Sequence, residues 1–303
     1  MITPLHDRDT LDVAGLERLI EHILSGGVHA VFILGTTGEA PSLSYRLRRE
    51  LITRTCRQVG DRIPVLVGIT DTAFVEAVDL ARHAADAGAR ALVTTAPYYF
   101  PAGQSELLEF LRHLVMELPL PVFLYNMPLM TKTRFEPETV QQLLDMEKIV
   151  GVKDSSGDMA YFAKIVELAR QRPDWSVLIG PEHLLVDALA RGGHGGVSGG
   201  ANVLPRLFVE LYEAARRADA ERVNTLQRRL LQLDQIYRVG QHASSVIKGI
   251  KCSLSLLGVC DDFMAEPLTR FRKPERERVR AVLESMELLA PPATKRVEAV
   301  EAG

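Results

Sequence analysis

Lys153 ends a short apolar run, residues 149–152, and is followed at once by a polar turn, residues 154–158. A lysine at the end of a buried strand can attack the carbonyl carbon of a substrate and form a Schiff base. Loss of solvation beside apolar side chains favours the neutral, nucleophilic amine over the ammonium ion. A lone lysine in this position could equally extend its amine from a strand end into water. Other polar residues must decide between these two interpretations.

A second apolar run, residues 122–125, ends in Tyr125, and a third, residues 91–93, leads to Tyr99. A phenol at the end of a strand can move protons to and from a carbonyl or carbinolamine oxygen. A lone tyrosine is more often a core residue whose hydroxyl group is hydrogen-bonded. Because residues at the carboxyl ends of barrel strands gather at one rim, we predict that Tyr125 and Tyr99 share a catalytic site with Lys153.

The run at residues 31–34 opens into Gly35-Thr36-Thr37-Gly38-Glu39. Its glycines permit a sharp turn whose amides and hydroxyls can hold a carboxylate. The stretch lacks the Gly-Lys-Ser/Thr ending of a phosphate-binding loop, and an ordinary strand–helix turn remains the alternative. We predict that Thr36 and Thr37 bind a substrate carboxylate, and that Glu39 supports the turn without touching substrate. Thr37 is also placed in a relay of hydroxyl groups with the two tyrosines.

Two glycine-rich stretches follow later apolar runs, and we predict that they line the substrate site through Gly180, Glu182 and Val197. The stretch at residues 192–200 could bind phosphate, or its glycines could allow close backbone packing around the amine. The eight histidines show neither of the spacings His-x-His and His-Glu-x-x-His. This pattern predicts a site without a metal ion, and the chemistry of a lysine imine requires no organic cofactor.

The elements that must position these residues are short apolar runs that alternate with amphipathic stretches. Runs that are continuously apolar indicate strands covered on both faces, as in a parallel sheet. With a candidate eighth run at residues 2–5, eight strand–helix units over about 200 residues predict an α/β fold, a (β/α)8 TIM barrel. No Gly-x-Gly-x-x-Gly follows the first strand, which disfavours a dinucleotide-binding fold. The seven clearest runs are residues 31–34, 65–67, 91–93, 122–125, 149–152, 177–179 and 195–197.

The strand pattern stops beyond Asn202. We predict a barrel over residues 1–215 and a C-terminal helical appendage over residues 216–289. Within the appendage, residues 244–257 and 274–288 have helical patterns. The stretch 290–303 is polar and poor in apolar residues, so we expect it to be disordered.

Composition limits the classes of function. The 303 residues are 47% hydrophobic and carry a formal charge of −3, which predicts a large core and neither a nucleic-acid surface nor a membrane-binding face. The N-terminus resembles no signal segment, and no window is apolar for long enough to span a bilayer. The three cysteines lack the spacing of metal ligands, and we interpret them as reduced thiols. We expect a soluble, cytoplasmic protein.

Taken in order, the motifs at Gly35–Glu39, Tyr98-Tyr99, Tyr125-Asn126-x-Pro128 and Gly151-Val152-Lys153-Asp154 resemble those of the dihydrodipicolinate synthase / N-acetylneuraminate lyase family. The resemblance runs over nearly the whole chain. It implies a class I pyruvate-dependent aldolase or lyase on a (β/α)8 barrel, usually a homotetramer, that joins or separates pyruvate and an aldehyde.

The resemblance also implies roles for individual residues. Lys153 corresponds to the Schiff-base lysine and Tyr125 to the proton-shuttling tyrosine. Thr36 and Thr37 correspond to the residues that bind the keto-acid carboxylate. Tyr99 corresponds to a tyrosine that, in the synthases, reaches into the site of a neighbouring subunit.

The positions at which this chain departs from the family pattern concern recognition of the acceptor, which is the aldehyde that reacts with pyruvate. The synthases hold a substrate carboxylate with an arginine two residues after the proline of Tyr-Asn-x-Pro, where this chain has the uncharged Met130. Sialic acid lyases carry Gly-x-Asp-Glu where this chain has Gly180-Pro181-Glu182-His183, and their serine corresponds to Gly199. The resemblance also places Met1 inside the first barrel strand, so that the front part of that strand is missing.

We therefore expect an aldolase for 2-keto-3-deoxy acids rather than a lysine-pathway synthase. The alternatives are 4-hydroxy-tetrahydrodipicolinate synthase, which joins pyruvate and aspartate semialdehyde, and a non-catalytic relative that binds a keto acid. A pyridoxal-phosphate enzyme would also use an imine-forming lysine.

Overall fold

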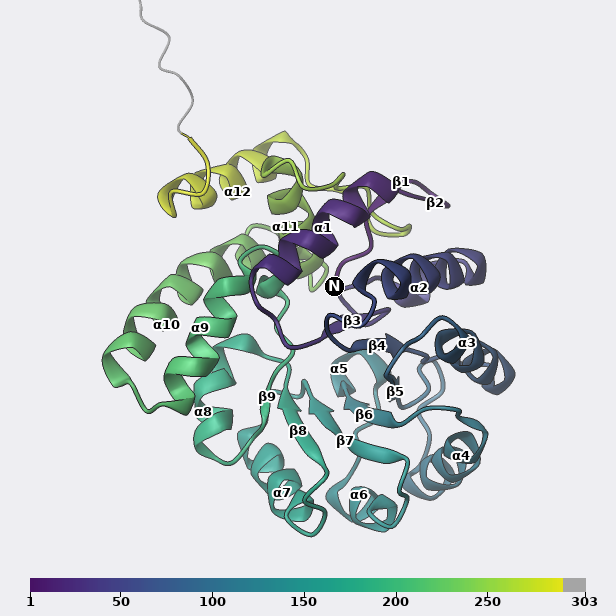
Figure 1. Ribbon diagram of the computed structural model, residues 1–303. Coiled ribbons are helices and arrows are strands. Elements are labelled where there is room, and N and C mark those ends of the chain that lie inside the picture. The colour runs from purple at the N-terminus through teal and green to yellow at the C-terminus, as the bar shows by residue number, and fades with distance from the viewer. Residues whose placement is uncertain (291–303) are drawn as a thin grey trace, which may run out of the picture.

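The computed structural model describes residues 1–290, which fold into a curled parallel sheet surrounded by helices (Figure 1). Within these residues the sheet holds seven strands whose spatial order follows the sequence. Each of the seven predicted runs contains a strand, and most residues of these strands are buried. The strands are β3 (Val31–Ile33), β4 (Val65–Gly68), β5 (Ala91–Thr95), β6 (Val122–Asn126), β7 (Ile149–Asp154), β8 (Ser176–Ile179) and β9 (Gly195–Gly196).

Helices alternate with these strands and place their apolar faces against the sheet. The helix α2, for example, begins after Ser44, whose hydroxyl accepts a hydrogen bond from the amide of Leu47 at 3.2 Å. The helices before and around the sheet are α1 (Val13–Ser25), α2 (Tyr45–Val59), α3 (Phe74–Asp86), α4 (Gln104–Glu117), α5 (Pro128–Thr131), α6 (Pro137–Leu143), α7 (Met159–Ala169), α8 (Leu185–Ala190) and α9 (Pro205–Arg216).

The predicted eighth strand at residues 2–5 does not join the sheet. β1 (Leu5–Asp7) instead pairs with β2 (Thr10–Leu11) in a two-stranded antiparallel hairpin. Pro4 has no amide hydrogen for a ladder, and the amide of Ile2 donates to Asn202 Oδ1 at 2.9 Å. Over residues 1–290 the sheet is therefore open, with β3 and β9 as its edges. The predicted α/β barrel is confirmed only as a curled parallel sheet of seven strands.

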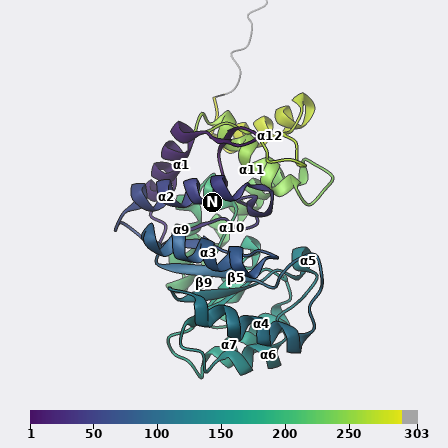
Figure 2. The same cartoon turned by 90° about the vertical axis from the view of Figure 1, so that its right-hand side faces the viewer.

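Three further helices, α10 (Ala220–Asp234), α11 (Ser245–Leu256) and α12 (Lys273–Ser285), follow the sheet. Figure 2 shows α11 and α12 beside α1, away from the strands. The division at residues 215 and 216 stays a prediction, although α9 ends at Arg216. Of the predicted tail, residues 291–303 lie outside the described residues. No helix within residues 1–290 combines the length and apolar character that a membrane crossing requires, and the location in the cell stays a prediction.

Candidate active site

The register between β6 and β7 places Tyr125 directly beside Lys153. The pairing shifts by one residue near the start of the two strands: Val122 pairs with Ile149, but Phe123 pairs with Gly151. This irregularity is a β-bulge, which adds one residue to β7 and changes which side chains face the interior. Without the extra residue, Tyr125 would pair with the residue before Lys153. Gly151 is required there, because a Cβ atom would lie 2.0 Å from the carbonyl oxygen of Ser176.

The Lys153 side chain is buried and lies against two aromatic rings. Its Nζ is 3.8 Å from the ring centroid of Tyr125 and 5.0 Å from that of Phe32. The two rings meet edge to face, with 6.2 Å between their centroids. Phe32 lies on β3, across the curled sheet from β7. The amine is therefore held inside the curl of the sheet and does not extend along its outer surface.

The hydroxyl group of Tyr125 lies 3.3 Å from Oγ1 of Thr36. The sequence predicted Thr37 in this relay; within this chain the preceding residue, Thr36, makes the contact with the Tyr125 hydroxyl. Burial raises the pKa of Tyr125, but the positive charge of Lys153 and hydrogen bonds with Thr36, Ser155 and Lys153 outweigh it. The net pKa of the phenol is below its ordinary value, as suits a group that exchanges protons.

The turn that carries Thr36 is anchored from the C-terminal helices. Glu39, at its end, forms a fully buried ion pair with Lys251 of α11. The other carboxylate oxygen of Glu39 accepts a hydrogen bond from the amide of Ala265 at 2.8 Å, and Lys251 Nζ donates to the carbonyl of Phe263 at 2.6 Å. Burial lowers the pKa of Lys251, and Glu39 opposes that change. These contacts fix the Thr36 turn against a distant part of the sequence.

A second buried network holds the carboxyl ends of β6 and β7 together. Asn126 Nδ2 donates to Asp154 Oδ1 at 2.7 Å, and Asn126 Oδ1 accepts from the amide of Phe135 at 3.1 Å. Ser156 donates to Asp154 through its amide and its hydroxyl. Burial raises the pKa of Asp154, while the bonds from Asn126 and Ser156 oppose the rise. The network locks the strand ends that present Tyr125 and Lys153.

Gly180, Glu182 and Val197 lie at or beyond the ends of β8 and β9. The amide of Gly180 donates to the carbonyl of Asp154 at 2.7 Å, and a Cβ atom there would lie 1.8 Å from Ser155 Oγ. The amide of Val197 donates to the carbonyl of Ile179 at 2.8 Å. These contacts extend the sheet, and the predicted roles of the three residues toward substrate stay predictions.

Glu182 is buried and already has partners within the protein. Its carboxylate accepts hydrogen bonds from the amide of Gly200 at 2.8 Å and the hydroxyl of Tyr237 at 2.9 Å. Burial raises the pKa of Glu182 to about 7, although these two hydrogen bonds act to lower the pKa. The contacts join the end of β8 to the turn after α10.

Tyr99 and Met130 lie at the surface of the single chain. The side chain of Tyr99 is 74% exposed and Met130 is 44% exposed. Tyr99 packs edge to face on Phe100, with 5.2 Å between ring centroids. The structure therefore does not bring Tyr99 to Tyr125 within this chain. The predicted role of Tyr99 in the site stays a prediction.

Comparison with known proteins agrees with this geometry. The model of the dihydrodipicolinate synthetase family matches residues 1–286. The 4-hydroxy-tetrahydrodipicolinate synthase of Methanospirillum hungatei is 32% identical over 286 residues, which cover 93% of this chain and 96% of that protein. The probable 2-dehydro-3-deoxy-D-pentonate aldolase YjhH of Escherichia coli is 31% identical, with 94% of each protein covered.

A solved structure with the same fold is the dihydrodipicolinate synthase of Bacteroides thetaiotaomicron. It is 52% identical, covers 94% of this chain and 96% of its own, and superimposes with a TM-score of 0.91. Names of synthases and aldolases among the relatives identify the chain as a lyase of the pyruvate-dependent class I aldolase type. With a lysine and a phenol in contact inside a parallel sheet and a family match over almost its full length, this chain belongs to the dihydrodipicolinate synthetase family.

Proposed function

We propose that the chain joins pyruvate to an aldehyde, or separates them, through a Schiff base on Lys153. The observation that carries this proposal is the contact of the buried Lys153 amine with the Tyr125 ring, together with the Thr36 hydroxyl on the Tyr125 phenol. This arrangement supplies a nucleophile and a proton carrier at one point.

In the proposed reaction, Lys153 Nζ attacks C2 of pyruvate and forms a carbinolamine. Tyr125, supported by Thr36, moves the protons that allow water to leave and the imine to form. The protonated imine then accepts electrons as a methyl proton leaves, which gives an enamine whose carbon attacks the aldehyde. Thr36 and Thr37 are proposed to hold the carboxylate of the keto acid. These reaction steps require neither a metal ion nor an organic cofactor.

For the acceptor we favour aspartate semialdehyde, the substrate of a 4-hydroxy-tetrahydrodipicolinate synthase. The names of the M. hungatei relative and of the B. thetaiotaomicron structure support this choice. The second candidate is the cleavage of 2-keto-3-deoxy acids, which the similarity to YjhH and the uncharged Met130 favour. Condensation with aspartate semialdehyde and pyruvate release from 2-keto-3-deoxy acids, measured side by side, separate the two candidates.

Tyr99 is proposed to complete the proton relay of a neighbouring copy, which would make a homotetramer the active form. The support is its exposure on the single chain and the family resemblance of the Tyr98-Tyr99 motif.

Replacing Tyr125 with phenylalanine should lower kcat by about 10²–10⁴-fold, because the ring remains while the proton carrier is lost. Steady-state release or consumption of pyruvate measures the effect. Tyr161→Phe is the matched control: its buried hydroxyl donates to the carbonyl of Phe135 at 2.7 Å, and its loss should lower stability by about 1 kcal/mol while kcat is retained. A Tyr125→Phe protein with more than a tenth of the original kcat would contradict the proposed proton transfer.

Replacing Met130 with arginine should lower the KM for aspartate semialdehyde by about tenfold, since a charge-assisted hydrogen bond to a carboxylate contributes about 1.5–3 kcal/mol. Leu129→Arg carries the same charge one residue away on α5 and should leave that KM unchanged. An equal response of both variants would mean that net charge, and not the position of residue 130, determines recognition.

A further inference from the structure

Glu182 is a buried carboxyl group that the proposed reaction does not use. Only 7% of the residue is exposed to solvent. The partners of its two oxygens are uncharged: Oε2 accepts from the amide of Gly200, and Oε1 accepts from the hydroxyl of Tyr237. Burying a carboxyl group without a counter-charge costs free energy, and burial accordingly raises its pKa. A carboxyl group in such a place points to a function for its two contacts.

The two contacts join distant parts of the sequence. Gly200 belongs to the stretch that follows β9, residues 197–202, which we call the β9 turn. Tyr237 belongs to the short 3₁₀ helix η4 (Gln235–Arg238), which follows α10. The backbone of Gly200 comes close to both side chains, since a Cβ atom there would lie 2.9 Å from the Tyr237 hydroxyl and 3.0 Å from Glu182 Oε1. Glu182 therefore ties the β9 turn to the helices that follow the sheet.

The β9 turn begins at the interior face of the sheet, next to the row of residues that contains the reacting amine. Lys153 pairs with Leu178, and Leu178 pairs with Gly195, so the three residues lie in one row across the strands. The amide of Val197 donates to the carbonyl of Ile179 at 2.8 Å, which continues the ladder beyond β9. Because side chains alternate along a strand, Val197 lies on the same face as Gly195, one step nearer the carboxyl rim.

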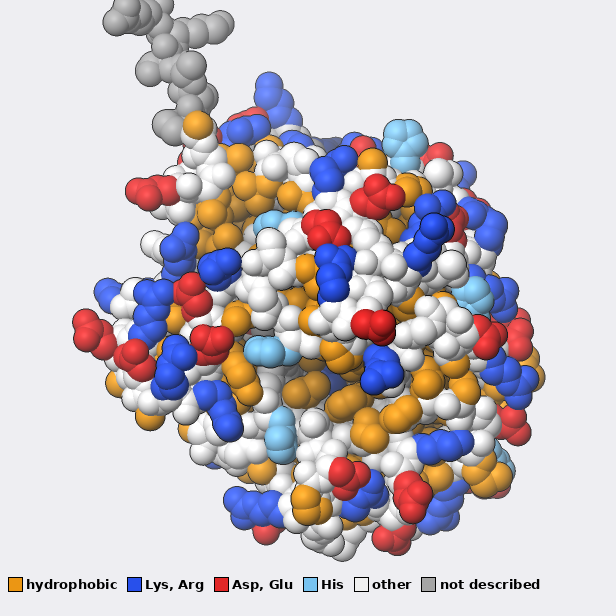
Figure 3. All heavy atoms as spheres, in the orientation of Figure 1, with side chains coloured by type: hydrophobic (Ala, Val, Ile, Leu, Met, Phe, Trp, Pro, Cys, Tyr) orange, Lys and Arg blue, Asp and Glu red, His pale blue; other side chains and the backbone are white. Residues whose placement is uncertain are grey.

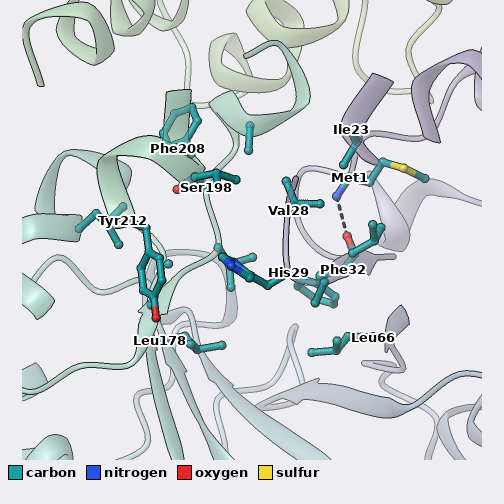
Figure 4. A pocket seen from close by; sticks show the side chains of 18 of the residues that line it. Met1, Ile23, Val28, His29, Phe32, Leu66, Leu178, Ser198, Phe208 and Tyr212 are labelled. Atoms are coloured by element: carbon teal, nitrogen blue, oxygen red, sulfur yellow. Dashed lines mark hydrogen bonds between the residues drawn. The ribbon is translucent and has the colours of Figure 1, made fainter. Parts of the chain in front are cut away.

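A cavity of about 310 Å³ connects the β9 turn with the surroundings of Lys153. Val197 and Ser198 line this cavity together with Phe32, whose ring centroid lies 5.0 Å from Lys153 Nζ. Figure 4 shows Ser198 and Phe32 on different sides of the cavity, and Figure 3 shows a hollow on this face, bordered by hydrophobic side chains and histidines. A shift of the β9 turn would therefore change the shape of the space next to the amine.

We propose that Glu182 and Tyr237 are positioning residues, which together hold the β9 turn where it borders the keto acid bound on Lys153. The inference rests on the proposed Schiff-base function. It also means that Glu182 does not bind the acceptor aldehyde. Both of its carboxylate oxygens already accept hydrogen bonds, so a substrate hydroxyl would have to displace Gly200 or Tyr237. Small displacements of a residue that borders a reacting group are enough to weaken binding or slow the reaction.

Hydrogen exchange without substrate tests whether the pair holds the turn. Glu182→Ala and Tyr237→Phe should speed amide exchange in the β9 turn by at least about tenfold, because each removes a contact that restrains it. Glu182→Gln should keep the original rates, since its oxygen can accept from Gly200 while its nitrogen donates to the Tyr237 oxygen. Tyr161→Phe is the matched control and should leave the rates unchanged, because its hydroxyl bonds elsewhere. Unchanged exchange in Glu182→Ala would overturn the proposal.

Kinetics of the same variants separate positioning from a purely structural role. Glu182→Ala should raise the KM for pyruvate by at least about tenfold while kcat stays within about threefold, and Glu182→Gln should retain both values. A lower Tm with an unchanged KM for pyruvate would overturn the proposal. So would a higher KM for the aldehyde alone, equal in the Ala and Gln variants, which would make Glu182 an acceptor ligand.

Borohydride trapping at saturating pyruvate distinguishes this inference from the function on which it rests. The original chain and all three variants should form the adduct, because Lys153 is intact in each. Trapping in the original chain without a change in the KM for pyruvate in Glu182→Ala would refute the positioning role alone. No adduct in the original chain would refute the proposed Schiff base and this inference with it.

Discussion

Replacing Lys153 with alanine is expected to lower kcat by at least about 10⁴-fold, because the variant lacks the nucleophile that forms the imine. The side chain is buried beside Tyr125 and makes no ion pair within residues 1–290, so its truncation removes the amine without leaving an unpaired carboxylate. The fold should persist, and circular dichroism and the unfolding transition would verify this. Turnover with pyruvate and the aldehyde measures the effect.

Trapping with borohydride locates the imine directly. Pyruvate and borohydride should add the mass of a reduced pyruvyl group to the original chain, at Lys153, and none to the Lys153→Ala variant. Lys148→Ala is the matched control, because Lys148 is exposed at the opposite end of β7 and donates to the carbonyl of Leu118 at 2.7 Å. It should retain both trapping and turnover. An adduct that persists in Lys153→Ala would place the Schiff base on another amine.

The strands and the pair of reacting groups could be predicted because each depends on local sequence. A continuously apolar run specifies a strand covered on both faces, and a polar residue at its end lies at the rim of the sheet. The end of β3 was less predictable. Leu34 takes a φ of 57°, which stops the strand at Ile33 although the apolar run continues.

The register of the site could not be predicted in the same way. Gly151 in the middle of an apolar run is a signal for a bulge, but the pattern does not say which residue of β6 then pairs with Lys153. Whether Thr36 or Thr37 contacts the Tyr125 hydroxyl depends on the backbone conformation of the turn after Leu34. No periodic sequence pattern specifies that conformation. The eighth strand was not confirmed: the apolar run at residues 2–5 contains a proline, the amide of Ile2 donates to Asn202, and Leu5 pairs with Leu11 in the hairpin.

The ion pair between Lys251 and Glu39 could not be predicted from local sequence patterns. Lys251 sits on an ordinary amphipathic helix, and nothing in its neighbourhood indicates that it pairs with Glu39 at the other end of the chain. Such a pair is found only when the fold brings the two residues together. Its presence means that the helices after the sheet help to position the Thr36 turn.

Replacing Lys251 with methionine is expected to destabilise the protein by about 3–5 kcal/mol, because it leaves the Glu39 carboxylate buried without its counter-charge. Urea unfolding measures the free energy. The variant should also raise the KM for pyruvate more than it lowers kcat, since Glu39 ends the turn and its amide donates to the carbonyl of Thr36 at 3.1 Å. A role confined to stability would leave the KM for pyruvate unchanged.

The two partners should respond unequally. In Glu39→Gln the amide side chain can still accept from the amide of Ala265, and Lys251 can release its proton, because burial already lowers its pKa, and still donate to the carbonyl of Phe263. This variant should therefore lose less stability than Lys251→Met. The double variant should recover most of the loss of Lys251→Met, because no unpaired charge remains. Equal losses in both single variants, or a double variant no better than Lys251→Met, would mean that packing around α11, and not the buried charge, sets the stability of the turn.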